Sequence, residues 1–339
     1  MGEQVFQYNN LFTLESGIVL NGFHLAYHQF GELNADSSNV VWVFHALTAN
    51  SNPTEWWQGI IGPNKLFDPA LYSIICVNMP GSCYGSISPL DINTDTEKKY
   101  YHDFPFFTIR DMVQSYQLLS NALGISKIKY GIGGSMGGQQ LLQWAVDEPH
   151  RFEHIIPIAT NAFHSQWGIA FNESQRWAIE TDPTWMLQQD DAGLAGMKAA
   201  RSIALLSYRN YKSYAAASVV HTNKNAATYQ RYQGEKLATR FNAFSYYFLS
   251  KAMDTHHLGN KSYTVKEALS KIKSNCLVIG ISSDILFPIS EQRFLAEHIE
   301  GASWQIIDSN YGHDGFLLEF DAITTAIKDW QNDIKTINI

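Results

Sequence analysis

The sequence has few cysteines, no long apolar run and no excess of positive charge. Cys76, Cys83 and Cys276 are its only cysteines. This odd, widely spaced set predicts no disulfide framework and favours a reducing compartment, which we expect to be the cytoplasm. Cysteine and histidine show no metal-ligand spacing, so we expect no metal site. No apolar run is long enough to cross a bilayer, which predicts no membrane span.

The charge balance and the first residues exclude further classes of protein. The formal net charge is −8, which argues against nucleic acid or an anionic membrane surface as the main partner. It leaves room for a local basic pocket that binds an anionic ligand. Residues 1–5 contain no basic segment before an apolar run, so we expect no signal peptide. Gly2 does not indicate myristoylation, because Phe6 stands where Ser or Thr is required.

The most informative stretch is Gly133-Gly134-Ser135-Met136-Gly137, which has the pattern G-x-S-x-G. A β-like segment at 127–132 precedes it, and a helical pattern at 138–146 follows. Strand, Gly-rich turn and helix is the context of a nucleophile elbow, in which the turn holds Ser135 in a strained conformation that tolerates only small neighbours. The start of the helix would favour negative charge beside the serine. The alternative is a Gly-rich turn with an accidental serine.

Apolar runs and helical spacing alternate through most of the chain. Continuous apolar runs are typical of strands buried on both faces, as in a parallel sheet flanked by helices. The predicted strands are 39–45, 73–78, 154–160, 275–281 and 304–308, and the predicted helices are 108–123, 291–298 and 321–336. This order predicts an α/β fold with a mostly parallel sheet. Two β-like arms around Asn21-Gly22, within residues 17–27, predict a hairpin.

The alternation stops between residues 161 and 274. This stretch has helical patterns rich in Trp, Tyr, Ala and Gln and no convincing buried strand. It is far longer than an ordinary connection between two strands. We therefore predict a core formed by residues 1–160 and 275–339, with a helical lid domain inserted at 161–274.

A serine nucleophile needs a base and an acid, and two later loops supply them. In α/β-hydrolase folds the chain order is Ser, then Asp or Glu, then His, each after a strand. Asp284 follows the strand at 275–281, and His313 follows the last predicted strand. Asp284 could instead cap the next helix, and His313 is one of twelve histidines. The order and the placement at the carboxyl edge of the sheet favour a Ser135–Asp284–His313 triad.

Two backbone amides are expected to form an oxyanion hole. One belongs to Met136, directly after the serine, and the other we place at Leu47, in the loop after the strand at 39–45. His45 is less suited to act as the base, because it lies too near the strand end and precedes the serine.

Four blocks together resemble the homoserine O-acetyltransferase family, whereas general esterases share only the serine motif. The blocks are His45–Thr48, Asn78 with Gly81–Ser86, Gly134–Gln139 and Gly312–Leu317, and Ser207–Arg209 of the helical segment also fits. The resemblance extends from about residue 7 to 330. It implies an α/β-hydrolase core, a helical lid that forms a homodimer, and acetyl transfer from acetyl-CoA to the hydroxyl of L-homoserine in methionine biosynthesis. It implies no metal or bound cofactor, with acetyl-CoA as a co-substrate.

The resemblance also implies roles for individual residues. Ser135, Asp284 and His313 match the nucleophile, acid and base, while Arg209 and Asp314 match substrate-binding residues. A guanidinium suits the homoserine carboxylate, and a carboxylate suits its ammonium. Without the resemblance, Arg209 would be interpreted as a solvated lid charge and Asp314 as a residue that positions its loop.

Two loops depart from the family pattern. Met79–Cys83 stands where the family usually has Leu-Gly-Gly-Cys, and Ala49 stands where it usually has Gly. Because both loops border the expected site, they could alter the acyl group accepted. Succinyl-CoA as donor or serine as acceptor stays open, since one methylene in a pocket changes binding by only about 1–3 kcal/mol. A serine esterase or thioesterase is a further alternative, against which the long lid and Arg209 argue. A non-catalytic relative is disfavoured by the complete triad.

Overall fold

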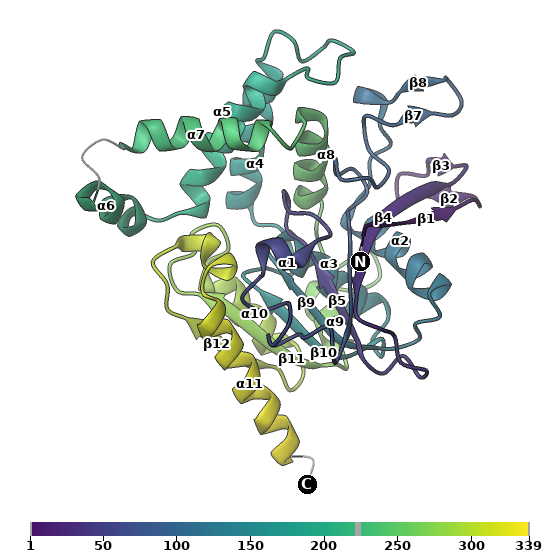
Figure 1. The fold of residues 1–339 in the computed structure, drawn as a ribbon, viewed down its shortest axis with the longest axis vertical. Coiled ribbons are helices and arrows are strands. Elements are labelled where there is room, and N and C mark those ends of the chain that lie inside the picture. The colour runs from purple at the N-terminus through teal and green to yellow at the C-terminus, as the bar shows by residue number, and fades with distance from the viewer. Residues whose placement is uncertain (1, 221–224, 338–339) are drawn as a thin grey trace.

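The computed structural model describes residues 2–220 and 225–337, and within these ranges the chain builds an eight-stranded sheet with helices on both faces (Figure 1). In spatial order the strands are β1 (Gln4–Tyr8), β4 (Phe23–Phe30), β6 (Ser73–Val77), β5 (Val40–Phe44), β9 (Ile128–Gly134), β10 (Phe152–Ile158), β11 (Asn275–Ile281) and β12 (Ser303–Ile307). β4 is antiparallel to both neighbours, and the pairs from β6 to β12 are parallel. The predicted α/β fold with a mostly parallel sheet is confirmed.

Helices alternate with these strands and also fill the long segment between β10 and β11. They are α1 (Pro53–Trp56), α2 (Ile109–Ala122), α3 (Met136–Asp147), α4 (Gln166–Glu180), α5 (Leu194–Tyr208), α6 (Tyr211–Val220), α7 (Ala226–Ala238), α8 (Ala243–Asp254), α9 (Val265–Ser270), α10 (Ile289–His298) and α11 (Phe320–Ile337). Two 3-10 helices, η1 (Tyr101–Asp103) and η2 (Gly312–Leu317), complete the set in the described residues.

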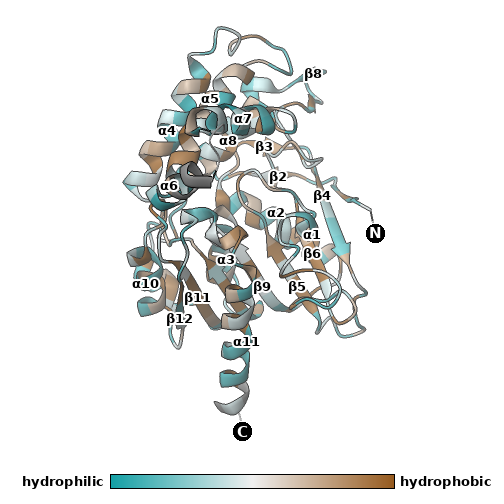
Figure 2. Ribbon diagram, turned by 60° about the vertical axis from the view of Figure 1, so that its left-hand side comes forward, coloured by the Kyte–Doolittle hydropathy of each residue, from teal (hydrophilic) through white to brown (hydrophobic). Residues whose placement is uncertain are grey.

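The central strands of the sheet are buried on both faces, as their apolar sequences require. Along β5, Trp42 and Phe44 belong to one hydrophobic cluster, and Val41 and Val43 belong to another. The first cluster includes side chains of α2, α3 and α10, and the second includes side chains of α11. Figure 2 shows hydrophobic residues concentrated in the strands between these helices. Because successive side chains of a strand point to opposite faces, a strand covered on both sides is apolar at every position.

The hairpin predicted around Asn21-Gly22 is wrong. β3 (Val19–Leu20) pairs with β2 (Phe12–Thr13), whereas β4 pairs with β1. Gly22 has a φ of +128°, and a Cβ placed there would lie 2.5 Å from the Tyr8 carbonyl oxygen. The glycine thus carries the chain past the end of β1 towards a different partner. A second small hairpin pairs β7 (Ile92–Asn93) with β8 (Lys98–Lys99).

Helices α4 to α8 gather at one end of the molecule, away from the C-terminal part of α11 (Figure 1). α4 packs against α5 and α8, and α5 packs against α7. The chain leaves and returns to the sheet through two paired segments, 162–164 and 256–258, which we call the neck. The His164 amide donates to the His256 carbonyl, and the Leu258 amide donates to the Ala162 carbonyl. The neck lies inside the predicted insertion 161–274, whose boundaries stay a prediction.

Candidate functional site

Ser135 lies at the sharp turn between β9 and α3 and has a strained backbone. Its φ is 58° and its ψ is −129°, a region that costs a non-glycine residue about 1–3 kcal/mol. Two contacts with the end of β10 hold the turn. The Ser135 amide donates to the Ile158 carbonyl at 3.0 Å, and the Thr160 hydroxyl donates to the Ser135 carbonyl at 2.8 Å. The turn therefore has the geometry that the G-x-S-x-G pattern predicts.

Gly137 allows β5 to approach this turn closely. A Cβ on Gly137 would lie 2.1 Å from the Phe44 carbonyl oxygen and 3.0 Å from that of His45. Any side chain at this position would push the end of β5 away from the first turn of α3. The contact holds the end of β5, from which the loop with Leu47 continues, against the first turn of α3.

His313 and Asp284 are brought together from the loops after β12 and β11. The His313 Nδ1 atom lies 2.6 Å from Asp284 Oδ2. Asp284 Oδ1 accepts hydrogen bonds from the Leu286 and Phe287 amides at 2.8 and 2.9 Å. Since a carboxylate only accepts, Nδ1 of His313 carries a proton, and Nε2 is the ring nitrogen not bound by Asp284.

Aromatic rings fix the orientation of the imidazole. Phe287 stacks on His313 with 5.0 Å between ring centroids, and Phe316 lies at 5.1 Å. The same Phe316 ring covers Gly134, where a Cβ would lie 2.4 Å from it. Phe316 thus touches both the turn that carries Ser135 and the ring of His313. Both Ser135 and His313 are buried.

The two backbone amides predicted to bind the oxyanion have no protein acceptor among the described residues. Met136 begins α3, so its N–H precedes the first hydrogen bonds of the helix. Within the described residues, neither the Met136 nor the Leu47 amide donates to a protein acceptor. Both residues are buried, and Met136 directly follows Ser135. Because buried amides are nearly always paired, the two unpaired amides are candidates for binding a ligand oxygen.

Arg209 and Asp314 meet next to His313. Arg209 follows α5, and Asp314 follows His313 in η2; Arg209 Nε lies 2.8 Å from Asp314 Oδ2. Burial raises the pKa of the Asp314 carboxyl, and Arg209 and Arg201 oppose that rise. Gly312 makes the approach possible, because a Cβ there would lie 2.8 Å from the Tyr208 carbonyl oxygen. The structure therefore places the two predicted substrate residues together.

The sequence did not indicate Glu291, a further carboxylate near His313. Glu291, in the first turn of α10, accepts a hydrogen bond from Asn161 at 2.9 Å, and Asn161 also accepts one from Gln139 of α3. Burial raises the pKa of Glu291 to about 7, with a further contribution from Asp284. In sequence Glu291 is an ordinary acidic residue of a first helical turn, so no pattern distinguishes it.

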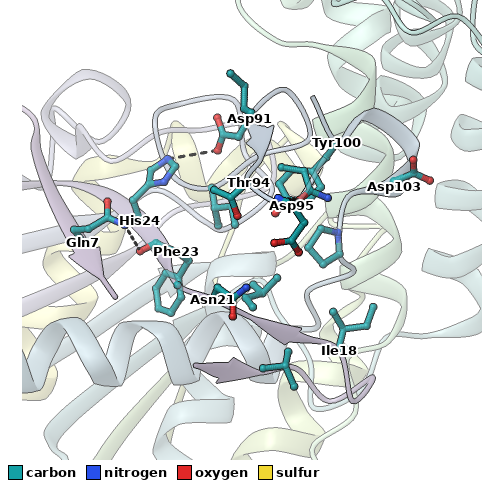
Figure 3. A pocket seen from close by; sticks show the side chains of 17 residues that line it. Gln7, Ile18, Asn21, Phe23, His24, Asp91, Thr94, Asp95, Tyr100 and Asp103 are labelled. Atoms are coloured by element: carbon teal, nitrogen blue, oxygen red, sulfur yellow. Dashed lines mark hydrogen bonds and ion pairs between the residues drawn. The ribbon is translucent and has the colours of Figure 1, made fainter. Parts of the chain in front are cut away.

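A hollow on another part of the surface contains none of these residues. Figure 3 shows it between β1, the β3–β4 segment and the β7–β8 region, with a contact of 3.4 Å between His24 and Asp91. In the described part of the chain no group of His, Cys, Asp and Glu has a metal-binding arrangement. No helix among the described residues is long and apolar enough to span a membrane.

Comparison with known proteins first defines the class. A family model described as alpha/beta hydrolase fold matches residues 39–320. The fold and the serine turn thus belong to that class. A homoserine O-acetyltransferase of Cyclobacterium marinum is 44% identical over 334 residues, which cover 97% of this chain and 95% of the relative. The chain belongs to the homoserine O-acetyltransferase family, as the sequence blocks predicted.

Solved structures agree with this assignment. A homoserine O-acetyltransferase from Staphylococcus aureus has a TM-score of 0.82 and 28% identity, with 98% of this chain and 95% of that chain covered. An acetylester hydrolase from Corynebacterium glutamicum has a TM-score of 0.88 at 22% identity and covers 97% and 95% of the two chains. The second similarity shows a shared fold alone.

Proposed function

We propose that this chain transfers an acetyl group from acetyl-CoA to the hydroxyl of L-homoserine, a step of methionine biosynthesis. The observation that carries the proposal is the Arg209–Asp314 pair beside His313, 2.8 Å apart. An esterase that passes its acyl group to water needs no pair of opposite charges there. A zwitterionic amino acid matches both charges, since its carboxylate suits Arg209 and its ammonium suits Asp314.

In the first half-reaction Ser135 attacks the carbonyl carbon of the thioester. His313 Nε2 accepts the hydroxyl proton, while Asp284 holds Nδ1 and stabilises the imidazolium. The Met136 and Leu47 amides donate to the oxyanion of the tetrahedral intermediate. The C–S bond then breaks, the imidazolium protonates the departing thiolate, and the acetyl group stays on Ser135.

In the second half-reaction the homoserine hydroxyl attacks the acetyl-serine ester. His313 accepts the hydroxyl proton, the bond between the carbonyl carbon and Ser135 Oγ breaks, and the proton returns to the serine. Arg209 and Asp314 hold the amino acid, which raises its effective concentration above that of competing water. The reaction uses acetyl-CoA as a co-substrate and requires no other cofactor or metal.

We propose that the insertion 161–274 is the lid over this site and joins two copies of the chain. It exposes large apolar side chains, with Met186, between α4 and α5, 76% exposed and Tyr211, at the start of α6, 86% exposed. Exposed apolar groups of this size are typical of protein interfaces. Three free cysteines and a biosynthetic use of acetyl-CoA support a cytoplasmic location.

A panel of acyl-CoA thioesters tests the function. Thiol release is followed with homoserine, serine or water as the acceptor. We expect acetyl-CoA to be used and homoserine to accelerate turnover. Turnover that ignores homoserine would exclude the transferase, and a preference for succinyl-CoA or serine would reassign the donor or acceptor. Ser135→Ala should abolish acylation.

Arg209→Ala tests the acceptor site separately. We expect homoserine use to weaken while the first acylation remains largely intact. Arg231→Ala, at an exposed arginine of α7, is the matched control and should change neither step. An equal loss in both half-reactions would give Arg209 a structural role or a role in the thioester step.

A further inference from the structure

His45, at the end of β5, is held at both ring nitrogens by backbone groups. Nδ1 lies 2.9 Å from the Ala46 carbonyl oxygen, and the Met79 amide donates to Nε2 at 3.1 Å. A carbonyl can only accept and an amide N–H can only donate, so the ring carries its proton on Nδ1 and is neutral. The side chain is 1% exposed, and this burial lowers the pKa of His45 to about 4.

The carbonyl that His45 binds shares a peptide group with the Leu47 amide. A trans peptide is planar, and its C=O and N–H point in opposite directions. A hydrogen bond that fixes the Ala46 oxygen therefore also fixes the direction of the Leu47 N–H. This amide has no other anchor among the described residues, because it donates to no protein acceptor.

The other side of the imidazole leads, through Met79 and Gln140, to the carbonyl of Met136. The Gln140 side-chain amide lies 3.1 Å from the Met79 sulfur and donates to the Met136 carbonyl at 3.1 Å. The Tyr116 hydroxyl in turn donates to Gln140 at 2.8 Å. A continuous path thus runs from Met136 through Gln140, Met79 and His45 to the peptide of Leu47.

We infer that His45 is the positioning residue of the oxyanion hole: it holds the Leu47 amide in line with the Met136 amide. This inference rests on the proposed acyl-serine chemistry. His45 does not touch the substrate or exchange protons with it. Its neutral ring acts by donating to one backbone group while accepting from another, so each half of its role can be removed separately.

Two substitutions separate the two hydrogen bonds. Counting bonds from Cβ, the amide nitrogen of Asn takes the place of Nδ1, and the carbonyl of Gln takes the place of Nε2. His45→Asn keeps a donor for Ala46 and loses the acceptor for Met79. His45→Gln keeps the acceptor and loses the donor. A residue that only fills space would respond similarly to both substitutions.

The measurement is the burst of p-nitrophenol released when p-nitrophenyl acetate acylates Ser135. We expect His45→Asn to acylate near the wild-type rate and His45→Gln to be about 10- to 100-fold slower, less than the full loss of an oxyanion donor. KM should change little in either variant. Equal rates for the two variants, whether fast or slow, would overturn the inference. The ester acylates any activated serine, so failure with acetyl-CoA or homoserine leaves this test readable.

A measurement on the wild-type protein covers the case in which a variant does not fold. In a ¹⁵N spectrum of histidine-labelled protein, His45 should show a protonated Nδ1 and an unprotonated Nε2 at neutral pH. It should keep this tautomer as the pH is lowered towards 5, because burial lowers its pKa to about 4. A protonated Nε2 at neutral pH would refute the inference that His45 positions the Leu47 amide.

Discussion

Two carboxylates near His313 lie in different environments. Asp284 accepts from His313 and from two backbone amides, whereas Glu291 is held by Asn161 and has a pKa raised to about 7 by burial. Environments that favour different protonation states in two carboxylates also suit them to different roles. Asp284 has the contacts of the ionised partner of the histidine, whereas burial of Glu291 favours its protonated form.

Asp284→Asn should slow acylation of Ser135 by about 10³- to 10⁴-fold, because the amide favours the wrong imidazole tautomer. The asparagine oxygen can still accept from the Leu286 and Phe287 amides, so the loop should keep its fold. Pre-steady-state acylation and the thermal unfolding midpoint measure the two effects. A loss below tenfold in a folded variant would remove Asp284 from the proposed triad.

Glu291 should make stability depend on pH. Its pKa is raised from 4.5 to about 7, so the folded state keeps a proton that the unfolded chain releases between these values. The contribution of this proton to the free energy of unfolding is therefore complete below about pH 4.5 and is lost as the pH rises through 7. Glu291→Gln should remove this part of the pH dependence and make the protein relatively more stable at pH 8.

Urea unfolding at a series of pH values measures this effect. Glu297→Gln on the same helix is the control, since Glu297 is exposed and its substitution should leave the profile unchanged. Identical profiles for wild type and Glu291→Gln would contradict the assignment.

At the scale of elements, the end of α5 lies directly on the turn that carries His313. Gly312 has a φ of +64°, and a Cβ there would come within 2.8 Å of the Tyr208 carbonyl oxygen. The Gly312 amide also donates to the Ser283 hydroxyl at 2.9 Å. This contact thus joins the end of α5, which Arg209 follows, to the turn that carries His313.

Gly312→Ala should raise the KM for homoserine, because the methyl group pushes Arg209 away from Asp314. Gly124→Ala is a close control: Gly124 has a φ of +70° but no atom within 4 Å of its added Cβ. Both variants should lose about 1 kcal/mol from the left-handed backbone. Steady-state kinetics at varied homoserine distinguish them; equal KM values would show that the contact does not position Arg209.

The central strands and the site order were predictable because they rest on local patterns. The run at 275–281 is apolar after its first residue, and it matches β11. Asp284 and His313 follow strand ends, where parallel strands bring loops together. The pairing of β3 with β2 was not predictable from Asn21-Gly22, because a close approach to Tyr8 decides it. The neighbours of Glu291 come from three distant elements, and no local pattern connects them.

At the scale of the whole molecule, apolar side chains remain exposed on the helices between β10 and β11. Trp177 on α4, Leu206 on α5 and Tyr232 on α7 are all more than half exposed. Burying such groups against a second copy contributes about 25 cal/mol per Å² of apolar area removed from water. This supports the proposed dimer through the lid.

Leu206→Glu should weaken that dimer, because a carboxylate in an apolar interface loses its hydration. Leu11→Glu is the control: Leu11 is 68% exposed and Leu206 is 55% exposed, but Leu11 lies near the N-terminal strands. Light scattering after size exclusion gives the mass of each. If wild-type protein is monomeric, or both variants stay dimeric, this surface is not the interface.

The neck makes the helical segment between β10 and β11 a unit that could be exchanged between related genes. Residues 162–164 and 256–258 run side by side, so the chain between them starts and finishes at one place. A gene segment for that stretch could be exchanged between relatives without cutting a strand of the sheet. Arg209 would travel with the exchanged segment, while Ser135 and His313 would stay behind. One recombination event could therefore combine the existing Ser135 and His313 with a helical segment that selects a different alcohol as acceptor.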